Sequence, residues 1–183
     1  MRHVVRSLNK RDLAFVVNVG DLIHPVPALK DRYSQAAANF HAQVKELRHP
    51  LYLTPGNHDI GDKPNNWAPA AGICDDFIDL WAEHFGADFH AFDHGGDRFV
   101  IINAQIINSG LEQERKQATW LEKELAVSDG RRIFLFSHYP PYFTRPGEVE
   151  NYDNIGEPGR TWMLDLMAKH KVEALLIGHV HNF

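Results

Sequence analysis

The chain of 183 residues contains a single cysteine, Cys74, so it cannot form an internal disulfide, and a reducing compartment is the default expectation. It has no run of lysine or arginine and its net charge is −5, so a nucleic-acid-binding surface is not indicated. No apolar run approaches the length that spans a membrane, and residues 1–12 are too charged for a signal peptide. These absences favour a cytoplasmic protein that associates with neither nucleic acid nor membrane.

Internal repeats, low-complexity tracts and convincing linkers are also absent, and the length suits one domain, residues 1–183. The chain offers no serine or cysteine nucleophile elbow for covalent catalysis, because Cys74 falls in a segment with helical periodicity rather than at a strand end. The sequence does not indicate an oligomeric state. The features that stand out are alternating apolar runs and twelve histidines.

Apolar runs alternate with helical patterns along the chain. The apolar runs predict buried strands at residues 13–19, 51–54, 133–136 and 172–177. Helical patterns predict helices at residues 31–48, 74–85 and 112–126, and another around Trp162, Met163, Leu166 and Met167. Residues 89–92 and 99–104 flank the turn His94-Gly95-Gly96 and predict a hairpin. The expected fold class is α/β, a sandwich flanked by helices.

Polar residues follow four of the predicted strands at the point where each strand ends. These strand ends carry Gly20-Asp21, Gly56-Asn57-His58-Asp59, Ser137-His138 and Gly178-His179-Val180-His181. In an open α/β sheet, ligands bind at the carboxyl ends of the strands, because the strand ends leave a crevice there. Glycine precedes three of these groups and lets the chain approach a ligand closely. We therefore expect these side chains to meet at one rim of the sheet.

The side chains at these strand ends are typical metal donors. Carboxylate, amide and imidazole groups together suit Mn²⁺, Fe²⁺, Zn²⁺ or Co²⁺ better than Ca²⁺ or Mg²⁺. Two cations about 3.5–4 Å apart, bridged by a carboxylate, support in-line attack on phosphorus. His179 and His181 alternate by two, so in an extended segment both point to one side and can reach two neighbouring cations.

The same motifs carry a family resemblance. G-D-x-x-H at residues 20–24, G-N-H-D at 56–59, S-H at 137–138 and G-H-x-H at 178–181 resemble the calcineurin-like metallophosphoesterases, in order and over nearly the whole chain. The resemblance implies a β-sandwich flanked by helices that binds two divalent transition-metal ions, with Mn, Fe or Zn expected.

The resemblance also implies a role for each residue of the site. Asp21 would bridge the two metals, while Asn57, His138 and His179 would complete one site. His181 would belong to the other site. His58 would be the general acid that protonates the leaving alkoxide, with Asp59 as the carboxylate that orients it.

One motif of the family is missing from this sequence. The family begins with an apolar strand that ends in D-x-H, whereas the twenty residues before Asp21 contain no such motif. The D-x-H at Asp88-Phe89-His90 follows Phe85-Gly86-Ala87 rather than a buried strand, so we do not expect it to be a substitute. The family also adds strands after G-H-x-H, while this chain ends at Phe183. We therefore expect a partial domain, truncated at both ends, whose second metal site keeps only Asp21 and His181.

The segments GDLIH, PGNHDIGDKP and QATWLEKEL further resemble a branch of the family that contains a protein serine/threonine phosphatase. The expected function is a metal-dependent phosphohydrolase that cleaves phosphate mono- or diesters by attack of a metal-bound hydroxide. Its substrate would be a small molecule or a phosphoprotein. The alternative is a degenerate member that acts as a binding or scaffolding module with an incomplete dinuclear site, and the missing D-x-H favours it.

Two features of the predicted rim stay open. His24 either touches substrate or caps the next segment. The acidic loop at residues 144–159 is either a solvated loop or part of a substrate rim beside the strand ends.

Overall fold

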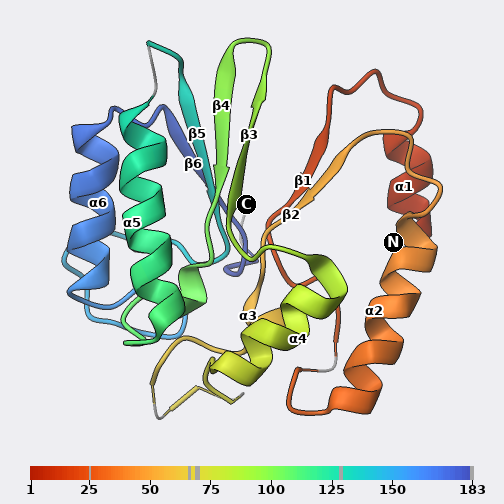
Figure 1. Cartoon of the computed structure of the whole chain (residues 1–183), viewed down its shortest axis with the longest axis horizontal. Helices are drawn as coiled ribbons and strands as arrows, with labels where there is room; N and C mark the ends of the chain where they lie inside the picture. The colour runs from red at the N-terminus through yellow and green to blue at the C-terminus, as the bar shows by residue number, and fades with distance from the viewer. Residues whose placement is uncertain (25, 66, 69–70, 128–129, 182–183) are drawn as a thin grey trace.

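A computed structural model describes residues 1–24, 26–65, 67–68, 71–127 and 130–181 of the chain (Figure 1). Its strands form two sheets. The smaller sheet pairs β1 (Val16–Asn18) with β2 (Leu51–Leu53) in parallel. The larger sheet has the order β3-β4-β5-β6, with these bounds: β3 His90–His94, β4 Asp97–Ile101, β5 Ile133–Ser137 and β6 Ala174–Ile177. Strands β4, β5 and β6 run parallel, so their carboxyl ends point to one edge.

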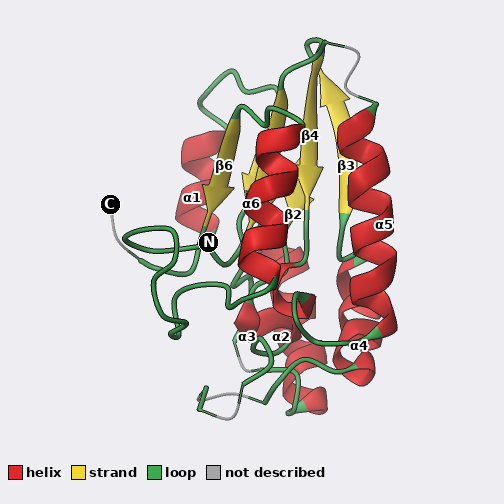
Figure 2. Ribbon diagram, turned by 90° about the vertical axis from the view of Figure 1, so that its left-hand side faces the viewer, coloured by secondary structure: helices red, strands yellow, loops and turns green. Residues whose placement is uncertain are grey.

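Helices cover the outer side of each sheet, which gives a layered α/β sandwich (Figure 1). On one side, α5 (Glu112–Ala126) and α6 (Gly159–Lys169) lie along the four-stranded sheet, as Figure 2 shows from the side. On the other side, α1 (Arg2–Leu8) and α2 (Lys30–Val44) flank β1 and β2. The remaining helices are α3 (Asn57–Ile60), α4 (Asp75–Phe85) and the short 3₁₀ helix η1 (Ala104–Ile106).

Two apolar cores hold these layers together. Buried residues of β4 and β5, such as Val100 and Leu135, pack with Leu121 and Leu125 of α5 and Met163 of α6. The second core joins α2 to α4 and includes Tyr33, Phe40 and Trp81, all of which are buried. Burial of each large side chain of this kind contributes about 1.5–3 kcal/mol. The cores keep the strands rigid and so position the loops at the strand ends.

Aromatic side chains connect the two sheets. The rings of Tyr52 in β2 and Phe92 in β3 stack with centroids 3.5 Å apart and an interplanar angle of 3°. Phe15, just before β1, meets Phe92 and Phe99 edge to face at 5.0 and 4.8 Å. Edge-to-face pairs add about 0.5–1.5 kcal/mol beyond area burial. The two sheets therefore face each other as the α/β sandwich prediction requires.

Most predicted elements are present, with shifted bounds. The hairpin is confirmed, because β3 pairs antiparallel with β4 and Gly95 and Gly96 have φ of +61° and +88°. A two-residue hairpin turn with positive φ at both central positions favours glycine at both. The strand predicted at residues 13–19 is shorter in the structure, and α1, α3 and η1 have no counterpart among the predictions. Among the described residues, no helix combines the length and apolar character that crossing a membrane requires.

Candidate metal centre

Asp21, His138 and His179 converge at the carboxyl ends of the strands. Asp21 follows β1, His138 follows β5, and His179 follows β6. Each offers a ligand atom, and these atoms all lie within 4.8 Å of one another. Residues more than a hundred positions apart in the sequence therefore meet, as predicted. Together with Asn57 they are called the donor group below. The prediction of a single sheet is wrong, because β1 belongs to the two-stranded sheet and β5 and β6 belong to the four-stranded sheet.

His138 presents one nitrogen to the donor group because its other nitrogen is occupied. Its Nδ1 lies 2.7 Å from the carbonyl oxygen of Val19, which can only accept, so Nδ1 carries the hydrogen. In the neutral ring Nε2 then has a free lone pair. This Nε2 lies 3.0 Å from Oδ1 of Asn57 and 3.4 Å from Oδ1 of Asp21.

His179 is held in the same way by a different carbonyl. Its Nε2 lies 3.2 Å from the carbonyl oxygen of Tyr152, so Nε2 carries the hydrogen and Nδ1 keeps the lone pair. Nδ1 of His179 lies 3.2 Å from Nε2 of His138. A metal-binding histidine usually donates its second ring N–H to a carbonyl or carboxylate in this manner, which fixes both tautomer and ring direction.

Burial keeps both imidazoles neutral. It lowers the pKa of His138, against the opposing attraction of Asp21. Burial also lowers the pKa of His179 to about 4, and the charge of a protonated His138 adds to this effect. Four acceptor atoms therefore face one another with no hydrogen between them: an oxygen of Asp21, an oxygen of Asn57, Nε2 of His138 and Nδ1 of His179. Their lone pairs repel one another unless a cation lies among them. The residues present fit a divalent transition-metal ion.

Asn57 points its amide oxygen at the donor group because two other side chains hold its amide nitrogen. Nδ2 donates to Oδ1 of Asp62 and to the hydroxyl of Tyr152, each at 2.9 Å. Tyr139 donates to the same Asp62 oxygen at 3.0 Å. Sequence reasoning missed Asp62, Tyr139 and Tyr152. The position of Asp62, three residues beyond G-N-H-D, and the placement of Tyr152 in the 144–159 loop were the available signals.

The backbone at the site adopts conformations that are uncommon for non-glycine residues. Asp21 and His179 have φ of +55° and +67°. Such left-handed residues cluster at functional sites, where the surrounding structure holds them. A Cβ atom on Gly56 would lie 2.2 Å from the backbone nitrogen of Asp21, so only glycine lets these two loops cross. Gly56 therefore allows one loop to pack closely on another, a role that the prediction of close approach to a ligand did not include.

His181, which is predicted to serve the second metal, lies in a turn rather than in the extended segment that the prediction assumed. It is exposed, its φ is +49°, and it is not part of the group formed by Asp21, His138 and His179. The prediction that His179 and His181 point to one side assumed an extended segment. Strand β6 ends at Ile177, and positive φ at both histidines turns the chain, so the alternation no longer applies.

Asp59 also departs from its expected role as the partner of the His58 ring. Its buried carboxylate accepts hydrogen bonds from the backbone nitrogens of Leu22, Ile23 and Gly56 at 2.8, 3.1 and 2.8 Å. Burial raises the pKa of Asp59 to about 8, while the three backbone bonds act in the opposite direction. Asp59 thus ties the loop after β1 to the loop after β2.

The ring of His58 instead contacts His24. Their Nδ1 atoms lie 2.8 Å apart, so one ring donates and the other accepts. The backbone N–H of His58 donates to Oδ1 of Asp21 at 3.2 Å, which places the residue beside the donor group. His24 does not cap the next helix, because the N-cap of α2 is Leu29 and has no side-chain cap bond.

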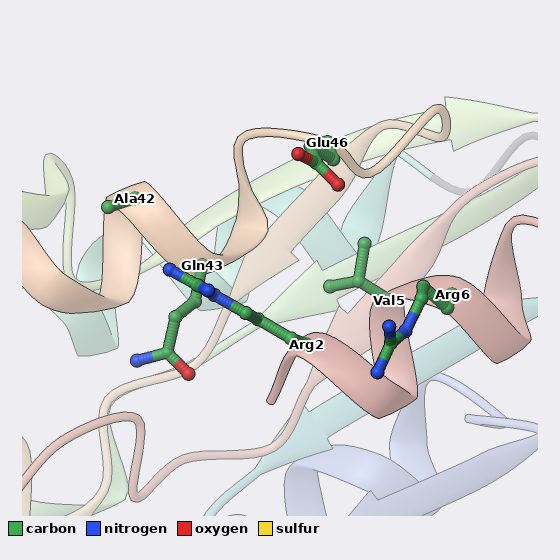
Figure 3. A pocket seen from close by; sticks show the side chains of 6 residues that line it. All are labelled: Arg2, Val5, Arg6, Ala42, Gln43 and Glu46. Atoms are coloured by element: carbon green, nitrogen blue, oxygen red, sulfur yellow. The ribbon is translucent and has the colours of Figure 1, made fainter.

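Two other features lie apart from the donor group. Oxygens of the buried Asp88 accept from Asn103 and Gln113 at 2.9 and 2.7 Å, so the D-x-H at residues 88–90 serves the core. A hollow of about 270 Å³ between α1 and α2 contains none of the donors (Figure 3). Its lining residues are Arg2, Val5, Arg6, Ala42, Gln43 and Glu46.

The layered α/β fold and the lone-pair donors at its strand ends define a metallophosphoesterase-type protein. The family model for calcineurin-like phosphoesterases matches residues 1–183, so the chain belongs to the calcineurin-like phosphoesterase family. This confirms the resemblance carried by the four motifs.

Named relatives agree with this family. The rat serine/threonine-protein phosphatase CPPED1 is 27% identical over 185 residues, which cover 97% of this chain and 56% of the relative. A probable glycerophosphodiester phosphodiesterase GpdQ of Arcobacter nitrofigilis is 32% identical over 150 residues, or 78% of this chain and 50% of the relative. The chain thus spans about half the length of these relatives. The crystal structure of a dimetal phosphatase from Danio rerio shares the fold, with a TM-score of 0.66 at 14% identity over 96% of this chain and 68% of that one.

Proposed function

We propose that the protein is a metal-dependent phosphohydrolase that cleaves phosphate mono- or diesters. The observation that carries the proposal is the convergence of the donor group: Asp21, Asn57, His138 and His179. A divalent ion held there would lower the pKa of a water molecule and neutralise charge on the phosphoryl oxygens. Mn, Fe or Zn suits these nitrogen and oxygen donors.

A second ion beside Asp21 is part of the proposal. Asp21 has two carboxylate oxygens, and one of them already lies 3.4 Å from Nε2 of His138. A bridging carboxylate can serve two ions, and His181 is the further imidazole next to this group in sequence. His181 is exposed and lies outside the donor group, as a ligand of a separate second ion would.

His58 is proposed as the general acid for the leaving alkoxide. Its backbone bond to Asp21 holds it at the rim of the donor group. Since its Nδ1 faces Nδ1 of His24, the proton for the leaving group would come from Nε2. His24 would then fix the tautomer and direction of the His58 ring, which is the task expected earlier of Asp59.

The substrate class follows from the relatives only in outline. The serine/threonine-protein phosphatases act on phosphoproteins by name, and GpdQ is named for a glycerophosphodiester. A phosphoprotein or a small phosphoester is therefore proposed for this protein. The alternative is a binding or scaffolding module with an incomplete dinuclear site, and the exposed position of His181 is the observation that favours it.

Metal dependence tests the proposal. The purified protein is stripped with a chelator, reloaded with Mn²⁺, Zn²⁺ or Fe²⁺, and assayed on phenyl phosphate and on a bis-aryl phosphate. We expect hydrolysis of at least one substrate only after metal is restored. Stoichiometric metal binding without hydrolysis of either ester would instead support the scaffolding module, and failure to bind metal would contradict both.

A further inference from the structure

Two buried cations fix the loop at residues 148–157 over the donor group. The Lys63 side chain is 4% exposed, and its Nζ donates to the carbonyl oxygens of Asn151, at 2.5 Å, and of Asn154. The Arg160 guanidinium donates to the carbonyl oxygen of Ile155 at 2.8 Å and to that of Glu148. Charged donors to backbone carbonyls form comparatively strong hydrogen bonds. The Lys63 and Arg160 side chains therefore fix the backbone of this loop at several points along its length.

This arrangement places Tyr152 against two members of the donor group. Its hydroxyl oxygen accepts from Nδ2 of Asn57 at 2.9 Å, and its carbonyl oxygen accepts from Nε2 of His179 at 3.2 Å. Its ring centroid lies 4.7 Å from that of His179. The phenol is thus adjacent to the amide whose other end, Oδ1, faces the lone pairs of the donor group.

The hydroxyl of Tyr152 has one hydrogen to donate. A phenol can donate once and accept as well, and at neutral pH it keeps its proton. Within the described part of the chain, the Tyr152 hydroxyl accepts from Asn57 but donates to no protein acceptor. A half-buried O–H beside a cation-binding group has an evident use when an anionic ligand enters.

We propose that the Tyr152 hydroxyl donates a hydrogen bond to a phosphoryl oxygen of the bound substrate. This assignment rests on the proposed phosphohydrolase function and adds a substrate-contacting residue to it. A purely structural role explains the contacts less well, because Asp62 already holds the Asn57 amide and the two cations already hold the loop. These restraints leave the proton of the Tyr152 hydroxyl available for a ligand.

The test replaces only the hydroxyl, with Tyr152→Phe. Tyr142→Phe is the matched control, since Tyr142 is a half-buried tyrosine in the same connection between β5 and α6 and belongs to neither the donor group nor its hydrogen-bond partners. Three quantities are measured for each protein: bound Mn²⁺, the dissociation constant of inorganic phosphate for the Mn²⁺-loaded form, and kcat/KM for phenyl phosphate.

We expect Tyr152→Phe to bind Mn²⁺ as the unaltered protein does, to bind phosphate more weakly, and to lose about 10- to 100-fold in kcat/KM, the range for a hydrogen bond to a charged group. Tyr142→Phe should change none of the three. Unchanged phosphate affinity in Tyr152→Phe, or a parallel loss of Mn²⁺, would overturn the proposal.

The phosphate measurement separates this inference from the proposed function. If the unaltered protein binds Mn²⁺ and phosphate without hydrolysing the ester, the enzyme proposal fails while the Tyr152 contact is still judged by phosphate affinity. If the Mn²⁺-loaded protein binds no phosphate, the Tyr152 assignment fails with it.

Discussion

The imidazoles at the rim fall into two regions that differ in how they are held. His138 and His179 are largely enclosed, and each donates one ring nitrogen to a backbone carbonyl. His24, His58 and His181 lie further out, and the first two contact each other rather than the backbone. The inner pair is therefore fixed in tautomer and direction before any ligand arrives, whereas the outer set depends on side chains that can turn in solvent.

This difference indicates which functions each region suits. A metal site needs donors held within a narrow geometry by surrounding hydrogen bonds. A proton donor needs access to the leaving group and to solvent, which an outer histidine has. The contrast between the inner and outer imidazoles leads to two expected effects, and the loop that carries Tyr152 adds a third, smaller one.

The largest expected effect is a difference in Mn²⁺ affinity between two variants, each of which lacks one histidine from one of the two regions. His179→Ala removes an inner donor, and we expect Mn²⁺ affinity to fall more than about 100-fold, beyond the range for residues that only support a ligand. His181→Ala should change affinity at the first site by less than about threefold. Metal titration of both variants checks this. Equal losses would show that the turn after β6 brings His181 inward when metal binds.

His58→Ala tests whether an outer histidine is the general acid, by comparing esters whose leaving groups differ in their need for a proton. An alkyl phosphate needs a proton on the departing oxygen, so we expect its kcat/KM to fall by about 100-fold or more. A nitrophenyl phosphate has a good leaving group and should be much less affected, with bound metal unchanged. Rates on the two esters are compared in the metal-loaded variant. Similar slowing of both would remove His58 from the acid role.

Glu148→Gln gives the smallest effect and concerns the loop that carries Tyr152. Hydrogen bonds from the backbone nitrogens of Phe143 and Thr144 and from the Asn154 side chain hold the pKa of Glu148 well below its usual range. A depressed folded-state pKa means that the charged carboxylate stabilises the fold above its unfolded pKa of about 4.3, and that this contribution is lost as the pH falls further.

We therefore expect Glu148→Gln to lower the thermal midpoint modestly at pH 7 and to lower it less at pH 3. Melting curves at several pH values measure this difference. Glu122→Gln, an exposed substitution on α5, is the control and should show no such trend. A deficit that stays constant down to pH 3 would mean that the charge of Glu148 is not what organises the loop.

Much of the architecture could be predicted because it depends on local patterns. The apolar runs marked β2, β5 and β6, and the pair Gly95-Gly96 marked the hairpin turn. The order of the four motifs predicted that Asp21, Asn57, His138 and His179 would meet at the strand ends. Within each sheet, residue type and strand period sufficed, because parallel strands bring their carboxyl ends to one edge. The packing of the two sheets face to face, which brings these edges together, had no signal in the strand pattern.

The sequence by itself thus determined the family, the sandwich and the inner donors. The tertiary structure alone decided that Asp59 binds backbone nitrogens of another loop, that a turn rather than an extended segment carries His181, and that Tyr152 reaches Asn57 across 95 positions. The physical reason is that hydrogen-bond partners depend on how loops cross in space. A left-handed φ at one residue changes the direction of the chain and so the side to which the next side chains point. The periodicity of apolar residues in the sequence does not predict such a turn.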